Sequence, residues 1–81
     1  MKRLRLIGID PSTGDDECPT VWFDEETREI VIQGWKASDE LRTACLETGS
    51  IPDSEDVVRL PERMVPILRK ACDAADGTDV R

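Results

Sequence analysis

The sequence predicts a small α+β protein: an antiparallel sheet of three to four strands, with two helices packed mainly on one face. Three features lead to this prediction. The N-terminus alternates between apolar and polar residues, and two β-rich runs flank a short polar turn. In addition, the segment Leu41–Cys45 returns 27 residues later as Leu68–Cys72 with four of five residues identical, each time after a β-like run. Such an echo indicates two strand-then-helix units sharing one sheet.

The chain is short, with 81 residues, of which 38% are hydrophobic and 4% aromatic. A chain of this length forms one domain with a thin core. We predict a single domain over residues 1–76 and a frayed tail over residues 77–81. A homodimer is possible, because a partner could supply part of the buried surface.

The first predicted strand covers residues 2–7, where Leu4 and Leu6 alternate with Arg3 and Arg5. A turn-rich acidic loop follows over residues 10–17. The runs Thr20–Asp24 and Glu29–Trp35 then predict a β-hairpin.

The hairpin has a predicted register in which Asp24 lies opposite Glu29. Cross-strand partners share a face, so one face is wholly apolar and is expected to meet the core. Its residues are Val21, Phe23, Ile30 and Ile32. The other face is mixed and carries both tryptophans, with Cys18, Thr20, Trp22, Val31, Gln33 and Trp35.

The first helix is expected to begin after Ser38, whose side chain suits an N-cap, and to end before Gly49. A strand is expected over residues 56–60. A second helix follows Pro61, with the apolar stripe Met64, Leu68, Ala71, Cys72 and Ala75. Pro66 leaves two alternatives: a separate turn before a helix that begins at Pro66, or a bend within one helix. In both helices, we expect the thiols of Cys45 and Cys72 to face inward.

The residue types exclude most chemistry. There is no His and no Tyr, so the commonest general base is missing, and no serine has a motif that would activate it. The three cysteines form no C-x-x-C pair, and the acids near Asp10 do not match a calcium loop. We therefore expect no enzyme, no catalytic residue, no cofactor and no metal site.

The net charge is −7, which disfavours direct binding to nucleic acid, where Lys and Arg supply the affinity. An acidic surface suits a partner with a basic or apolar surface, although acidic loops also serve solubility alone. The apolar run 6–9 is too short for a signal peptide, and no run could span a membrane. A cytoplasmic location is expected.

Trp22 and Trp35 are the main candidates for partner binding, because Trp is enriched at interface hot spots. The alternative is that both belong to the core. The acids expected to surround and steer a partner are Asp15, Asp16, Glu17, Asp24, Glu25 and Glu26.

Three segments, Cys18–Thr20, Gln33–Lys36 and Asp56–Pro61, resemble a family of small acidic actinobacterial proteins of unknown function. Those proteins are encoded beside helix-turn-helix regulators, and the chain is also loosely similar to the DUF397 family. The resemblance implies a protein-interaction module that acts as companion to a DNA-binding transcriptional regulator. The alternative from the residues is a thiol- or metal-responsive sensor that uses Cys18 and the acidic loop.

Overall fold

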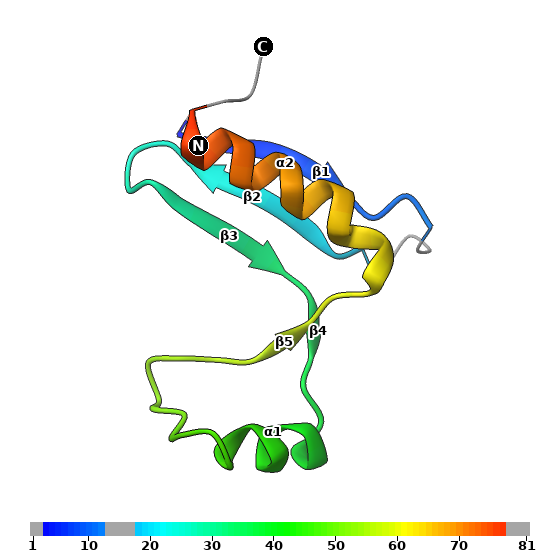
Figure 1. The fold of residues 1–81 in the computed structure, drawn as a ribbon, viewed down its shortest axis with the longest axis vertical. Coiled ribbons are helices and arrows are strands. Elements are labelled where there is room, and N and C mark those ends of the chain that lie inside the picture. Colours follow the sequence, from blue (N-terminus) through cyan, green and yellow to red (C-terminus); the bar gives the residue numbers. More distant parts are fainter. Residues whose placement is uncertain (1–2, 13–17, 78–81) are drawn as a thin grey trace.

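The computed structural model describes residues 3–12 and 18–77. It confirms the α+β class (Figure 1). The elements follow one another as β1 (Leu4–Ile9), β2 (Thr20–Asp24), β3 (Glu29–Gln33), β4 (Trp35–Lys36), α1 (Asp39–Leu46), β5 (Val58–Arg59), a 3₁₀ turn η1 (Glu62–Met64) and α2 (Val65–Asp76). Strands β1, β2 and β3 form an antiparallel sheet in that order, and β4 and β5 form a separate two-stranded pair.

The β2–β3 hairpin has the predicted register, with Asp24 opposite Glu29. Its turn is closed by Asp24, whose Oδ1 accepts hydrogen bonds from the amides of Glu26 (3.0 Å) and Thr27 (3.2 Å). Arg28 takes a left-handed conformation with φ 63°, which is uncommon for a residue with a side chain. Its guanidinium donates to the carbonyl of Ala75 (2.8 Å), so the turn is fastened to the end of α2.

The first strand spans Leu4–Ile9, ends two residues beyond the predicted end at Ile7, and contains a bulge between Leu6 and Gly8. Because of the bulge, Gly8 lies opposite Val21 on the face that α2 covers. A Cβ on Gly8 would lie 3.0 Å from the side chain of Ile67, so the glycine permits the close approach of helix and strand. Leu6 lies opposite Trp22, on the other face.

The core lies between the sheet and α2. Val21, Met64 and Ala71 are fully buried, and Ile7, Leu60, Ile67 and Leu68 pack against them. Of the two alternatives at Pro66, the separate turn is confirmed: η1 precedes α2, which starts one residue before the expected Pro66. Pro66 falls in the first turn of the helix, where its missing N–H removes no hydrogen bond.

The predicted stripe on α2 needs one correction. The buried residues of this helix are Ala71 and Ala74, whereas Cys72 is exposed. The sheet contacts the sector of the helix around Met64 and Ala71, and Cys72 lies about 100° away from Ala71 on the helical wheel. The inward orientation predicted for both thiols is therefore wrong for Cys72, and Cys45 is only half-buried.

The larger correction concerns α1, which was expected to lie beside α2 on the sheet. Of the two described helices, only α2 packs there, and α1 stands at the other end of the molecule (Figure 1). The chain leaves the sheet at Gly34, where a Cβ would lie 2.6 Å from the carbonyl oxygen of Arg59, so β4 and β5 cross closely. We call the β4–β5 pair the neck and residues 37–57 the arm.

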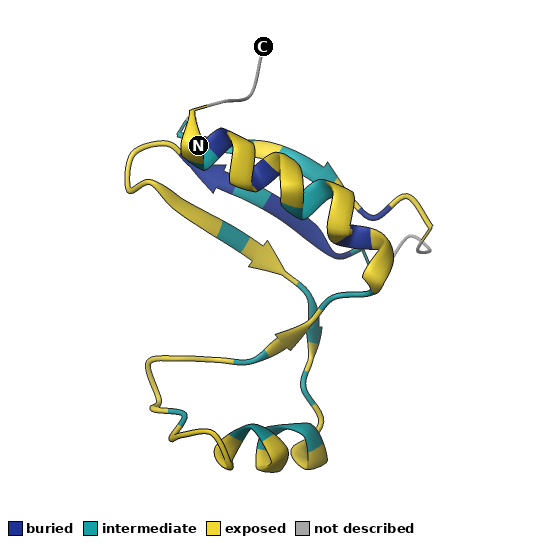
Figure 2. Ribbon diagram, in the orientation of Figure 1, coloured by how far each residue is buried: buried dark blue, intermediate teal, exposed yellow. Residues whose placement is uncertain are grey.

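The arm is held by its own contacts. Ser38 caps α1 as predicted, and its Oγ accepts a hydrogen bond from the amide of Leu41 (3.1 Å). Arg42 forms an ion pair with Asp56 across the arm (2.8 Å). No residue of α1 is buried, and the arm is largely exposed in Figure 2. The radius of gyration is 14.2 Å, against about 12 Å for a compact chain of this length.

Candidate functional site

The face of the sheet opposite α2 carries an apolar row at its centre. Leu6 of β1 lies opposite Trp22 of β2, which lies opposite Val31 of β3. These three side chains share a face because directly opposed residues of antiparallel strands point the same way. Val21 and Phe23, their neighbours in β2, point to α2 and are buried.

No described helix packs against this open face. Leu6 is 52% exposed, and Trp22 and Val31 are half-buried. Ile9 and Leu4 extend the apolar surface along β1. The central strand therefore presents a tryptophan between two aliphatic side chains on an uncovered face, and Trp is a residue type that is enriched at interface hot spots. This row, Leu6–Trp22–Val31, is the candidate site.

The acids predicted to surround a partner lie in different environments. Asp24 is buried and accepts hydrogen bonds within its own turn, and Arg3 lies 3.2 Å from its carboxylate. Burial raises the pKa of Asp24, but the amides of Thr27 and Glu26 and the charge of Arg3 outweigh burial and hold the pKa below its ordinary value. Asp24 thus stabilises the hairpin.

Glu25 and Glu26 lie at the exposed tip of the hairpin. Glu26 is 3.3 Å from Arg3, and Glu25 is 3.8 Å from Arg5. These ion pairs partly neutralise the charge that was expected to steer a partner. The other three predicted acids, Asp15, Asp16 and Glu17, lie outside the described residues, as does the predicted tail beyond Gly77.

Trp35 does not share the sheet with Trp22, because the chain turns into the neck at Gly34. The guanidinium groups of Arg59 and Arg63 lie over its ring, 5.5 Å and 6.0 Å from the ring centroid. Its indole Nε1 is shielded from solvent and has no acceptor among the described residues. This environment suits a structural residue of the neck more than an exposed anchor. The assignment of Trp35 to a partner remains a prediction.

One ion pair was not foreseen from the sequence. Asp10, at the end of β1, is 2% exposed and accepts two hydrogen bonds of 2.9 Å from Nε of Arg63, while Nη2 of Arg63 lies 2.8 Å from Oδ2. Hydrogen bonding to this carboxylate raises the pKa of Arg63 above its ordinary value. The pair joins the sheet to η1 and brings Arg63 to Trp35. A separation of 53 residues leaves no signal in the sequence for it.

Cys18, the residue of the sensor hypothesis, is half-buried before β2. Its carbonyl accepts hydrogen bonds from the hydroxyl of Thr20 (2.7 Å) and from the side-chain amide of Gln33 (2.9 Å), and these bonds hold the chain at the start of β2. Among residues 3–12 and 18–77, no group of three or more Cys, Asp or Glu is placed to hold a metal ion.

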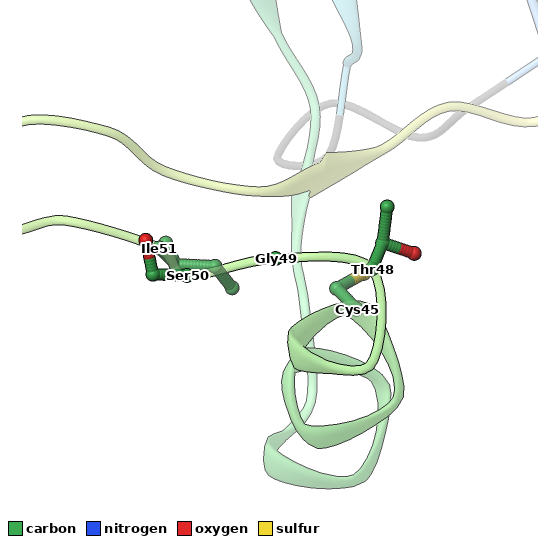
Figure 3. A pocket seen from close by; sticks show the side chains of 5 residues that line it. All are labelled: Cys45, Thr48, Gly49, Ser50 and Ile51. Atoms are coloured by element: carbon green, nitrogen blue, oxygen red, sulfur yellow. The ribbon is translucent and has the colours of Figure 1, made fainter.

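A shallow hollow of about 370 Å³ lies in the arm (Figure 3). Its lining is Cys45, Thr48, Gly49, Ser50 and Ile51. These residues offer two hydroxyls, one thiol and no charged group, so the hollow presents neither a general base nor an anion site.

Comparison with known proteins gives no assignment: no protein-family model, curated protein or solved structure matches the chain. The described helices include none with the length and apolar character needed to cross a membrane.

Proposed function

We propose that the chain is a non-enzymatic protein-interaction module that acts as companion to a DNA-binding transcriptional regulator. The observation that carries this proposal is the apolar row Leu6–Trp22–Val31 on the uncovered face of the sheet. A thin domain with three aromatic residues places one of them at the centre of this face, where a partner surface would bury it.

The charge of the chain supports a partner with a basic surface. The net charge is −7, and the arm alone carries six acids and one base, Arg42. Acidic surfaces accelerate association with basic partners and disfavour direct contact with phosphate backbones. A DNA-binding regulator presents such a basic surface, and the resemblance of three segments to companions of helix-turn-helix regulators points to the same class of partner.

The test is affinity capture with a matched pair of variants. Trp22→Ala removes the proposed anchor, whereas Val65→Ala removes methyl groups that are 37% exposed on the outer side of α2. We expect the unmodified chain and Val65→Ala to recover the same helix-turn-helix regulator from the native cell, identified by mass spectrometry. We expect Trp22→Ala to recover at least tenfold less.

Two results would overturn the proposal: recovery of no DNA-binding regulator, or equal recovery by Trp22→Ala in a chain whose circular dichroism is unchanged. The sensor alternative makes a different prediction, namely a melting temperature that rises with Zn²⁺ or Ca²⁺ or changes with an oxidant and depends on Cys18.

A further inference from the structure

The helix-covered side of the sheet also has an uncovered part, next to α2. Ile30 and Ile32 of β3 share the face of Phe23 and Val21, their cross-strand partners. Helix α2 lies over β1 and β2, and β3 extends beside it (Figure 1). As a result, Ile30 and Ile32 are 39% and 40% exposed, although their partners are buried.

One flank of α2 borders these two isoleucines. The opposite flank contacts β1 through Ile67, whose side chain meets Gly8. The flank toward the β2–β3 turn is marked by Ala75, whose carbonyl accepts the hydrogen bond from Arg28. Residues three and four apart in a helix lie on one side, so this flank also carries the exposed Cys72 and the half-buried Leu68. We call the combined apolar surface the ledge: Ile30, Ile32, Leu68, Cys72 and Ala75.

Helix α1 carries a short apolar stripe that the arm covers only in part. Leu46 is 52% exposed, Leu41 and Cys45 are half-buried, and the helix has only eight residues. A helix this short is not stable in water unless it packs against something. Helix α1 lies at the opposite end of the molecule from α2 (Figure 1), so it does not reach the ledge of its own chain.

The exposed area of the chain is large enough for a stable dimer. The accessible surface is 6147 Å², whereas a compact monomer of 9.1 kDa exposes roughly 4,900 Å². The excess is on the order of 1,200 Å² per chain, and a standard interface buries about 800 Å² per partner.

We infer that two copies of the chain associate by exchanging arms, so that α1 of each copy packs on the ledge of the other. Two-fold symmetry makes the exchange reciprocal, and each copy gives and receives one helix. Each sheet then carries two helices on one face, one of them from the second copy. The shared pattern Leu-Arg-x-Ala-Cys gives each helix a Leu and a Cys four residues apart on one side, and these are available for packing side by side, whereas Ala71 is already buried against the sheet.

This inference goes beyond the proposed function, because it uses the face of the sheet opposite Trp22. It places Cys45 of one copy near Cys72 of the other. The two thiols of one chain lie on helices at opposite ends of the molecule (Figure 1).

Cysteine cross-linking between two variants tests the exchange. In a Cys18→Ser background, Cys45→Ser retains Cys72 and Cys72→Ser retains Cys45. Equimolar mixtures treated with a short bismaleimide at micromolar concentration should give a covalent dimer, at several times the yield of either variant alone. Equal yields from the mixture and the single variants, or no covalent dimer, would overturn the exchange.

Sedimentation equilibrium provides the second measurement. The unmodified chain should have the mass of a dimer at micromolar concentration. Ile32→Glu on the ledge and Leu46→Glu on α1 should each weaken association at least tenfold, because each buries a charge in an apolar contact. Leu6→Glu, on the opposite face, should leave the dimer intact while it weakens regulator binding. A monomer at all concentrations, or a dimer insensitive to both ledge and α1 variants, refutes the inference.

Discussion

Val21→Ala offers a direct test of where the core lies. Val21 is fully buried in the central strand and packs in the cluster with Met64 and Ala71. The substitution deletes two methyl groups, and each buried methyl group removed costs about 0.5–1.5 kcal/mol, including the cavity left behind. The expected loss is about 1–3 kcal/mol, out of a total of roughly 4–12 kcal/mol for a domain of this size.

The matched control is Val65→Ala, which makes the same deletion at a residue that is 37% exposed on α2. Its effect should stay within about 0.5 kcal/mol. In thermal unfolding followed by circular dichroism, a loss of ~2 kcal/mol lowers the melting temperature by roughly 8–16 °C. Equal shifts for the two variants, or a Val21→Ala shift of less than about 2 °C, would show that α2 does not pack on β2 as described.

Three further variants test the neck, the arm and the hairpin. Gly34→Ala places a Cβ 2.6 Å from the carbonyl oxygen of Arg59 and should lower the melting temperature, whereas Gly49→Ala, with no atom within 4 Å of its Cβ, should not. Ser38→Ala removes the N-cap and should cost α1 about 1 kcal/mol, seen as faster amide hydrogen exchange in the arm with unchanged protection in the sheet. The pKa of Asp24 lies below its ordinary 3.8, so its contribution is present above about pH 4 and is lost as the pH falls through the folded value. Asp24→Asn should therefore flatten the fall in melting temperature below pH 4, and an unchanged slope would contradict this account.

The hairpin could be predicted from the sequence because its information is local. Alternation in residues 20–24 and 29–33 allows one register that gathers Val21, Phe23, Ile30 and Ile32 on a face, and a shift by one residue would break it. The N-cap at Ser38 and the turn before α2 are equally local, since they depend on a hydroxyl and on two prolines.

The remaining features depend on contacts between distant segments. The strand expected over residues 29–35 is interrupted at Gly34 because the backbone of Arg59 passes close by, and no local pattern records that approach. The stripes of α1 and α2 look alike in sequence, yet only α2 meets the sheet. Helical periodicity says that a face is apolar, but it does not say which surface covers that face.

The candidate site was predicted in part. Trp22 lies where the hairpin register placed it, on the mixed face. The pairing of Trp22 with Leu6 depends on the register between β1 and β2, and the separation of Trp35 from Trp22 depends on the neck. Both features arise from pairing between segments that are distant in the sequence. The sequence therefore indicated Trp22 as an anchor residue but did not indicate the row around it.

The neck has a consequence for how the chain tolerates changes in length. The arm leaves the neck at Lys36 and returns to it at Val58, and these two residues are paired neighbours. The arm is therefore a loop whose two ends are adjacent in the structure. Closing a loop of twice the length costs only about 0.6 kcal/mol more. Insertions, deletions or a grafted peptide between these two residues should leave the sheet and α2 folded, which makes the arm a natural position for variation and for engineering.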